Sequence, residues 1–466
     1  MSKSNNPTFR NLGKVKQAED ELFSKFQCPD EAVKEAIALT PLCRNIKVLF
    51  SGPPGTGKSA LVAGISIVYF GGKNIGHVAC DQSLMPDDVL WKLDLGALLK
   101  DGKEIVEARG IVIQPVKWIQ EPGNANETLQ KSLLSLLAEQ EVVYRDQVFR
   151  SPDYLCFGDF NPVTLGGSSE FSWPFKDRWD EQIDIENLPL LSRVRLTLIK
   201  FTKGNIKDLR KIFQPVLSQT LIEEIWVDVE RVDVPRWVAI FTELLIETYS
   251  GCVFDRNRQS QKYKNSCLQG KCEFYGELCS KIEVPISYRA TDALISLAKA
   301  RAWRARRTKI NFDDVMFVFC FVLNHRIKLK SDFGAIYTSN MEFLTETLKT
   351  LQENKFNTFG LAAKHYIEIM EGKSSPETLM KLDDLSRKNL AVRPLFIEAA
   401  KFITSKESGI VETIEKTLSD LEKKTFTEND LDAIRKKIDE KVLSEGQRRR
   451  LTYRVDNLSK VRHPNE

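Results

Sequence analysis

The chain has 466 residues, of which 42% are hydrophobic and 28% are charged, and its formal net charge is +4. The length predicts about two to four domains, and the composition is typical of a soluble globular protein. This small net charge excludes a protein drawn to nucleic acid or to a membrane by overall charge alone. The longest apolar run, Val315 to Leu323, is too short to span a bilayer, and residues 1–7 lack the apolar segment of a signal peptide. We therefore expect a cytoplasmic protein without a membrane span.

The first 200 residues predict an α/β fold. Residues 1–20 are polar and are expected to form a flexible tail, and a helix-favouring stretch follows from Asp30 to Ile37. From Ile46 to about Lys200, short apolar runs alternate with helical segments, which predicts a parallel sheet with helices on both faces. The apolar runs are 46–50, 77–80, 116–119 and 154–157.

One motif in this region carries most of the functional signal. Residues 52–59 match G-x-x-x-x-G-K-[ST], the phosphate-binding loop (P-loop) of nucleoside triphosphatases, between an apolar run and an apolar helical segment. Its glycines let backbone N–H groups point at phosphate oxygens, and the N-terminus of the next helix adds partial positive charge. Lys58 is expected to contact the β and γ phosphates of ATP, and Ser59 to contact Mg²⁺. The expected cofactor-binding residues are Gly52, Pro53, Pro54, Gly55, Thr56, Gly57, Lys58, Ser59 and Ala60.

Two further apolar runs end in polar side chains suited to ATP hydrolysis. Run 116–119 is followed by Gln120 and Glu121, and Glu121 is placed to polarise the attacking water. Gln120 stands where an aspartate usually helps to hold Mg²⁺. Run 154–157 leads to Asn161, which is placed to orient the water or to contact the γ-phosphate. Together with Lys58, these residues form the predicted hydrolytic set.

With these motifs in this order, the sequence resembles MoxR-type AAA+ ATPases from about Glu21 to Lys330. Residues 159–162, Asp-Phe-Asn-Pro, are similar to the family's sensor 1 motif. Residues 177–179, Asp-Arg-Trp, resemble the motif whose arginine reaches the nucleotide of the neighbouring subunit. Residues 287–290, Ser-Tyr-Arg-Ala, resemble the lid motif that carries the sensor 2 arginine.

The resemblance implies that Arg178 is the trans-acting arginine and that Arg289 is sensor 2. Arg193 and Arg195 are rival candidates for the trans arginine, and a solvated surface group is the alternative for each of these arginines. The resemblance also implies a hexameric ring with ATP at the subunit interfaces. Such a ring remodels or matures a protein client, often with a partner that carries a von Willebrand factor A domain.

Gln120 is the main departure from the family pattern. An amide can contact metal-bound water, but it lacks the charge that helps to hold Mg²⁺. ATP binding is expected to survive, because the phosphates supply most of the affinity for Mg²⁺. Two alternatives therefore stand beside a fully active ATPase: slow hydrolysis, and a nucleotide-gated assembly protein with little turnover.

After residue 200, helices dominate the predicted structure. We expect a nucleotide-binding core over 21–200, a helical lid over 201–330 and a helical C-terminal extension over 331–466. The lid ends in a predicted helix pair, 290–303 and 312–323, joined by a basic turn. The extension is expected to dock a partner or client.

The lid contains a Cys-rich insertion at about 250–282, which is not among the family features. Nine cysteines in a cytoplasmic chain favour thiols or metal ligands over disulfides. Four thiolates suit a structural Zn²⁺ site or, as the less favoured choice, an iron–sulfur cluster. Their spacing is not that of common zinc fingers, so unrelated thiols in a basic loop stay an alternative. The four candidate ligands are Cys252, Cys267, Cys272 and Cys279.

Basic residues in this insertion and in the lid allow a third hypothesis, a nucleic-acid-associated ATPase. Arg256, Arg258 and Lys262 lie near Tyr263, a pairing that suits phosphates and bases. A solvated polar face is the favoured interpretation, both here and for the lid segment 299–307.

Overall fold

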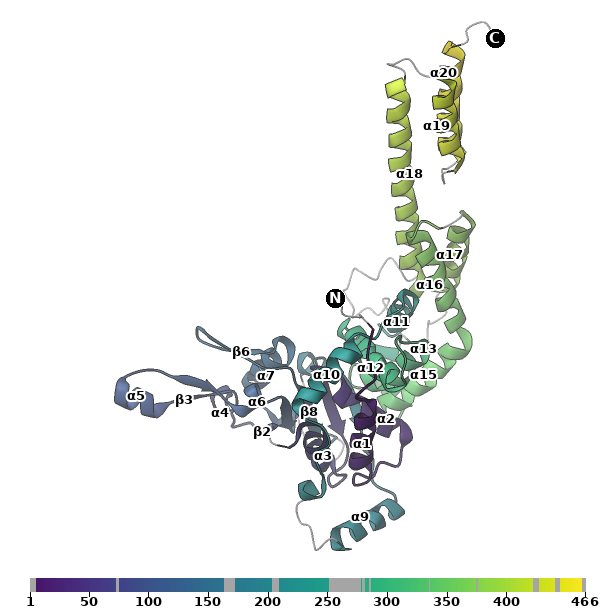
Figure 1. The fold of residues 1–466 in the computed structure, drawn as a ribbon. Coiled ribbons are helices and arrows are strands. Elements are labelled where there is room, and N and C mark those ends of the chain that lie inside the picture. The colour runs from purple at the N-terminus through teal and green to yellow at the C-terminus, as the bar shows by residue number, and fades with distance from the viewer. Residues whose placement is uncertain are drawn as a thin grey trace. The chain divides into compact units, whose positions relative to one another are not determined.

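The computed structural model describes residues 6–72, 75–162, 172–202, 209–250, 278, 281–284, 286–334, 336–373, 376–421, 427–440 and 445–462. The chain divides into two compact units, which Figure 1 shows as a ribbon. The first unit comprises Met1–Gly251 and Leu278–Lys349, and the second comprises Cys252–Glu277 and Thr350–Glu466.

A five-stranded parallel sheet forms the centre of the first unit, with the strand order β2-β5-β8-β1-β9. Its strands are β1 (Lys47–Ser51), β2 (Ile75–Ala79), β5 (Val116–Gln120), β8 (Leu155–Phe160) and β9 (Glu181–Asp184). The first four coincide with the predicted apolar runs, so the predicted parallel sheet is confirmed. Strand β9 lies at the sheet edge and is mostly polar, Glu-Gln-Ile-Asp, which is why no apolar run predicted it.

Helices pack on this sheet because they carry apolar side chains that the strands bury. Helix α7 (Glu127–Glu139) contributes Leu129 to a buried cluster that also contains Leu49 of β1 and Ile119 of β5. Helix α3 (Lys58–Phe70) contacts β5 and β8 and is buried along nearly its whole length. A helix that is apolar all round is typical of a core position. The α/β fold class is therefore confirmed.

Two small hairpins and three short helices join the strands of the sheet. The hairpins are β3 (Trp91–Leu93) with β4 (Val106–Ala108), and β6 (Glu141–Tyr144) with β7 (Gln147–Arg150). The short helices are α4 (Pro86–Val89), α5 (Leu95–Asp101) and α6 (Gly110–Ile113). None of these elements was predicted, because each is too short to show a clear period.

The N-terminal segment corrects one prediction. A flexible tail is predicted for residues 1–20, whereas helix α1 (Leu12–Phe23) already begins at Leu12. The helix buries Leu12, Val15, Ala18 and Leu22. Their spacing of three to four residues places them on one helical face, and the charged residues between them hid this pattern. Helix α2 (Glu31–Leu39) and the turn η1 (Thr40–Leu42) follow, and Asp30 caps α2 with its carboxylate as its composition predicts.

The remainder of the first unit is mostly helical. Its elements are α8 (Trp173–Lys176), α9 (Leu190–Thr202), η4 (Leu209–Ile212), α10 (Gln219–Glu230), α11 (Arg236–Thr248), β10 (Ile282–Val284), α12 (Arg289–Arg304), α13 (Phe312–Leu323), β11 (Lys328–Leu329), α14 (Ser331–Gly334) and α15 (Asn340–Asn354), within which the unit ends. Helices α12 and α13 match the predicted lid pair to within one residue at each end. A capping box between Asn311 and Asp314 starts α13.

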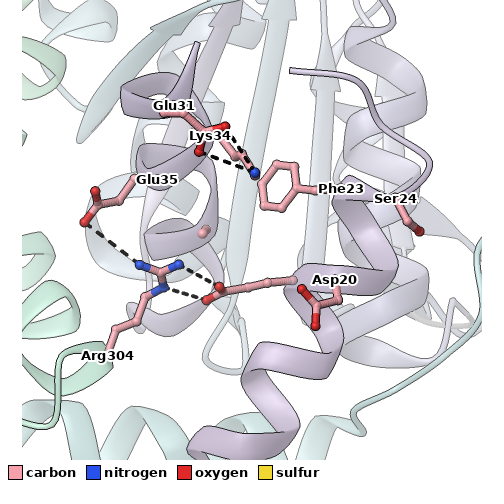
Figure 2. Close-up of a pocket in the computed structure, with 9 residues that line it drawn as sticks. Asp20, Phe23, Ser24, Glu31, Lys34, Glu35 and Arg304 are labelled. Atoms are coloured by element: carbon pink, nitrogen blue, oxygen red, sulfur yellow. Dashed lines mark hydrogen bonds and ion pairs between the residues drawn. The ribbon is translucent and has the colours of Figure 1, made fainter. Parts of the chain in front are cut away.

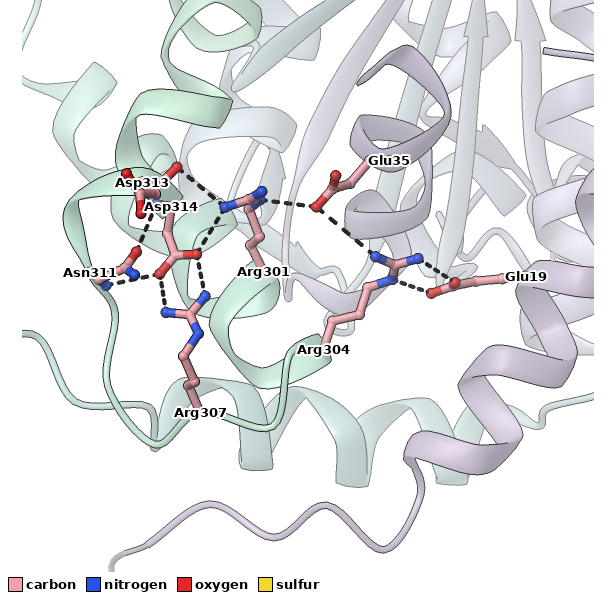
Figure 3. A network of polar contacts seen from close by, with 8 residues as sticks. All are labelled: Glu19, Glu35, Arg301, Arg304, Arg307, Asn311, Asp313 and Asp314. Carbon is pink, nitrogen blue, oxygen red and sulfur yellow. Dashed lines mark hydrogen bonds and ion pairs between the residues drawn. The ribbon is translucent and has the colours of Figure 1, made fainter. Parts of the chain in front are cut away.

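Two arginines of α12 join the lid to α1 and α2, and Arg307 in the turn after α12 pairs with Asp314 of the lid itself (Figure 3). Arg304 makes two hydrogen bonds of 2.7 Å to the carboxylate of Glu19 on α1. Arg301 donates to Glu35 on α2 at 2.9 Å and to Asp314 at 3.2 Å. The predicted solvated basic face is therefore in large part an ion-pair network, because carboxylates face these arginines.

The second unit is helical, which confirms the helical C-terminus. Its helices are α16 (Phe356–Met370), α17 (Pro376–Lys388), η7 (Leu390–Val392), α18 (Arg393–Leu421), α19 (Glu428–Glu440) and α20 (Glu445–Arg462). Leu418, Ile434 and Val455, one from each of the last three helices, belong to one buried cluster. Across the described segments of both units, no helix is long and apolar enough to cross a membrane.

Candidate nucleotide site

The P-loop motif connects β1 to α3, which is the predicted strand–loop–helix context. Gly57 precedes α3 with a φ of +91°, a left-handed conformation that favours glycine. Gly52 lies so close to the backbone of Ile185 that a Cβ atom would stand 2.2 Å from its carbonyl oxygen. The motif therefore has the tight backbone path that presents N–H groups to an anion.

Lys58 is buried at the base of this loop. Its Nζ donates to the carbonyl oxygens of Gly52 at 2.6 Å and Pro53 at 3.1 Å, and to Asn161 Oδ1 at 3.0 Å. Burial lowers the pKa of Lys58, whereas the negative charges of Asp159 and Glu121 raise it. The P-loop amine thus lies within reach of both strand ends that sequence analysis singled out.

Glu121 is half-buried directly after β5, in a left-handed conformation with a φ of +48°. Its Oε1 accepts a 2.7 Å hydrogen bond from Asn161 Nδ2, and its backbone N–H donates to the carbonyl oxygen of Asp159 at 2.8 Å. Its Oε2 is buried and has no hydrogen-bond partner within the described part of the chain. Burial raises the pKa of Glu121, and a hydrogen bond with the backbone of Asn161 opposes that rise.

Asp159 is an acidic residue of the site to which sequence analysis gave no role. It lies at the end of β8, buried, and its Oδ1 accepts a 2.6 Å hydrogen bond from Trp118 Nε1. The side chain of Ser59 also hydrogen-bonds its carboxylate. Burial raises the pKa of Asp159, and these two hydrogen bonds and the charge of Lys58 lower it. The only hint in the sequence was its place two residues before Asn161.

Gln120 of β5 pairs with Asp159 of β8, but its side chain contacts β2, the strand on the opposite side of β5. Its Oε1 is 3.3 Å from Nε2 of His77 on β2. The His77 ring stacks on Trp118 with the ring centroids 4.2 Å apart. His77 has no predicted role, since the four histidines of the chain form no cluster along it.

The two arginines of the predicted catalytic set lie around Asp177 in this chain. Arg289 at the start of α12 donates to Asp177 Oδ2 at 3.1 Å, and Ser287 donates to Oδ1 at 2.8 Å. The buried Arg326 pairs with Oδ1 at 3.7 Å. Arg178 is partly buried and donates to the carbonyl oxygen of Pro174 at 3.1 Å.

The structure therefore separates the predicted catalytic set into two groups. Lys58, Glu121 and Asn161 are joined by hydrogen bonds at the P-loop, whereas Arg289 pairs with Asp177 and Arg178 is the next residue along the chain. The rival arginines, Arg193 and Arg195, are exposed on α9.

Metal ligands were predicted at two places. The candidate Zn²⁺ or iron–sulfur ligands, Cys252, Cys267, Cys272 and Cys279, lie outside the described residues. Among the residues that are described, no group of three or more His, Cys, Asp or Glu side chains is arranged to hold a metal ion. Mg²⁺ needs no such cage, because it binds through one or two carboxylates together with substrate phosphates. The Ser59 hydroxyl and the Asp159 carboxylate are oxygen donors at the P-loop and fit that chemistry.

A pocket of about 630 Å³ lies between α1, α2 and α12 (Figure 2). Glu19, Asp20, Glu31 and Glu35 supply four carboxylates to its lining, against the cations Lys34 and Arg304. No P-loop residue lines it, and its excess of carboxylates disfavours phosphate groups. We therefore assign the nucleotide to the P-loop and not to this pocket.

Comparison with known proteins agrees with this geometry. Residues 47–179 match the AAA domain of the dynein-related subfamily, and residues 278–346 match the AAA lid domain. The nucleotide-binding part of this chain belongs to the AAA+ family. The two matches span the sheet with its P-loop and the helix pair α12–α13.

The AAA+ fold also matches a solved structure, that of a "putative ATPase" from Cytophaga hutchinsonii. The two chains share 20% sequence identity with a TM-score of 0.57, over 73% of this chain and 94% of the other. This likeness shows a common fold. Among proteins with curated descriptions, none is detectably similar to this chain in sequence. The MoxR subtype stays a prediction.

Proposed function

We propose that this AAA+ protein binds and hydrolyses Mg-ATP, and that it does so in a ring of MoxR type that remodels a protein client. Lys58 holds the β and γ phosphates, and Ser59 contributes to the Mg²⁺ site. Glu121 polarises the attacking water, and Asn161 orients Glu121 and the γ-phosphate. Mg²⁺, when bound, neutralises charge on the phosphates and fixes their position.

The observation that carries hydrolysis is the buried Oε2 of Glu121, to which no described residue donates a hydrogen bond. Asn161 fixes Oε1 at 2.7 Å and is itself held by Lys58 at 3.0 Å, so one oxygen of the carboxylate is anchored and the other has no partner among the described residues. A buried acceptor without a partner is costly and rare in native proteins. A water that donates to Oε2 removes this cost and is then aligned for attack on the γ-phosphate.

The ring and its partners rest on the family resemblance together with the placement of Arg178. Its guanidinium donates to the carbonyl oxygen of Pro174 at 3.1 Å, and the residue is partly buried directly after Asp177. An arginine so placed suits contact with the nucleotide of a neighbouring subunit in a head-to-tail ring. We propose a hexamer, with a protein client and a von Willebrand factor A partner as the bound proteins.

The test is steady-state phosphate release from Mg-ATP by the wild type and by Glu121→Gln. We expect turnover in the wild type and a loss of about 100-fold or more in the variant, with ATP binding retained. Glu127→Gln is the matched control, because Glu127 is an exposed residue of α7 that pairs with Lys131 four residues on. Equal background release in all three proteins, with ATP bound, would refute hydrolysis by this chain alone.

Gln120 favours a second candidate function, a nucleotide-gated assembly protein with little turnover. Its amide brings no charge to the Mg²⁺ site, and its oxygen is turned toward His77. This candidate predicts that ATP drives ring formation in the wild type and in Glu121→Gln alike, without phosphate release. Size-exclusion chromatography with and without ATP measures the assembly.

The nucleic-acid hypothesis loses support from the lid. Arg301, Arg304 and Arg307 are each paired with carboxylates, so these guanidinium groups are already neutralised. Binding of the chain to DNA or RNA would then depend on the Cys-rich insertion, and salt-sensitive binding that Cys267→Ser abolishes would revive the hypothesis.

A further inference from the structure

The carboxylate that this AAA+ site lacks on β5 is present on the next strand. Parallel pairing places Gln120 of β5 directly opposite Asp159 of β8, which in turn lies opposite Phe50 of β1. Residues paired in this way share one face of a sheet. Strand β8 lies between β5 and β1, so Asp159 stands one strand nearer to the P-loop strand than Gln120 does.

The contacts of the two side chains point in opposite directions. Asp159 is hydrogen-bonded by Ser59 in the first turn of α3, and its charge interacts with Lys58. Gln120 instead has its oxygen 3.3 Å from His77 on the far side of β5. The residue that reaches the P-loop hydroxyl is therefore the acid.

The shape of the site supports a role for Asp159 beyond packing. Trp118 Nε1 donates to its Oδ1 at 2.6 Å, which fixes the rotation of the carboxylate. The residue is only 3% exposed, and burial disfavours its charged form, which the charge of Lys58 offsets only in part. A divalent cation shared with the neighbouring Ser59 hydroxyl would compensate that charge, and carboxylate and hydroxyl oxygens are the ligands that Mg²⁺ prefers.

We propose that Asp159, and not Gln120, is the carboxylate that holds the Mg²⁺ of bound Mg-ATP together with Ser59. The acid therefore stands on β8, in register with the position at the end of β5 where the family pattern has an aspartate. This inference rests on the proposed ATP binding and names the residue that completes its metal site. Ser59 and Asp159 bind the cation side of the nucleotide, while Glu121 is left to the attacking water.

The experiment measures the affinity for a fluorescent ATP analogue with Mg²⁺ and with EDTA. The ratio of the two dissociation constants reports the metal contribution and needs no turnover. We expect Asp159→Asn to lower this ratio by about tenfold or more while binding in EDTA is kept, since loss of a metal-site residue typically costs that much in metal affinity. Gln120→Ala, which removes the side-chain contact with His77, should keep the ratio of the wild type.

Mn²⁺ in place of Mg²⁺ gives a second readout, because its electron paramagnetic resonance spectrum reports the affinity of the bound Mn-nucleotide directly. The double variant Gln120→Asp with Asp159→Asn moves the acid back to β5 and should restore part of the ratio. If Asp159→Asn has the same ratio of dissociation constants with Mg²⁺ and with EDTA as the wild type, the assignment of Asp159 is wrong.

If Gln120→Ala lowers the ratio of the two dissociation constants, the assignment is also wrong, whether or not Asp159→Asn folds. If the wild type binds the analogue but without any effect of Mg²⁺, the Asp159 assignment fails and nucleotide binding stands. If the wild type binds no nucleotide, the proposed function itself fails and the assignment falls with it.

Discussion

Asp177 accepts a 3.1 Å hydrogen bond from Arg289 and thereby ties the end of the AAA domain to the first turn of the lid helix α12. The same carboxylate accepts from Ser287 and pairs with the buried Arg326 at 3.7 Å. Three lid side chains thus converge on one acid of the Asp-Arg-Trp motif. The residue next to the proposed trans arginine therefore contacts the lid through three side chains.

We predict that Asp177→Asn destabilises the protein by about 1–3 kcal/mol, because the buried Arg326 and the half-buried Arg289 lose their shared counter-charge. Glu283→Gln is the matched control, since the Lys328–Glu283 pair of the lid is exposed and should contribute less than about 1 kcal/mol. Urea unfolding of both variants and of the wild type measures the difference. Equal midpoints for the two variants would contradict the role given to Asp177.

A buried acid on the edge strand predicts an unusual dependence of stability on pH. Burial raises the pKa of Glu181 on β9 from 4.5 to about 8, although a hydrogen bond from Thr40 opposes the rise. Between these two values the folded protein holds a proton that the unfolded chain releases. The free energy of unfolding should therefore decrease as pH rises from about 5 to about 8, by up to ~3 kcal/mol from this group.

Glu181→Gln should remove most of this decrease, since its amide does not titrate. Chemical unfolding at pH values from about 5 to about 8.5 measures the slope in each protein. The exposed Glu186 gives a control variant, Glu186→Gln, which should keep the wild-type slope. If the free energy of unfolding of Glu181→Gln decreases with pH as steeply as that of the wild type, other groups cause the decrease.

The sequence predicted the parts of the fold that have a strong local pattern. The P-loop and the strand ends at Glu121 and Asn161 could be found because apolar runs and polar punctuation mark them. Strand β9 could not be found, since a mostly polar edge strand of four residues has no such pattern. Helix α1 was missed because the charged residues between Leu12 and Leu22 outweighed its apolar spacing.

The candidate site was only partly predictable for a different reason. The pairing of Gln120 with Asp159 depends on the register between two strands that lie 39 residues apart in the sequence. No local pattern encodes that register, which tertiary packing sets. The convergence of Ser287, Arg289 and Arg326 on Asp177 is likewise a long-range contact. The separate motifs could therefore be predicted, but the contacts that Asp159 and Asp177 make between them could not.

Glu121 predicts an acidic limit to ATP turnover. Burial raises its pKa, and it can act as a base only when it is deprotonated, so turnover should fall as pH decreases through this raised value. Asn161→Ala removes the amide N–H that donates to Glu121 Oε1. Because a donor to a carboxylate favours its charged form, the acidic limb should move to higher pH in that variant. The measurement is kcat against pH for both proteins. An acidic limb at the same pH in both would show that another group limits the rate.

A ring with shared sites predicts that two inactive variants restore each other. Arg178→Ala should lose turnover and keep ATP binding, as Glu121→Gln does. In a mixed ring, a subunit with Arg178→Ala keeps its Glu121, and a neighbouring subunit with Glu121→Gln keeps its Arg178. At equal amounts and random assembly, roughly a quarter of the interfaces hold both residues, so phosphate release should reappear on mixing.

The mixing experiment separates action across an interface from action within one chain. If Arg178 served the nucleotide of its own chain, every interface in the mixture would lack one of the two residues and no turnover would return. Arg193→Ala is the control, because Arg193 is exposed on α9 and its loss should leave turnover near the wild-type rate. Loss of turnover in Arg193→Ala, with recovery on mixing it with Glu121→Gln, would transfer the trans role from Arg178 to Arg193.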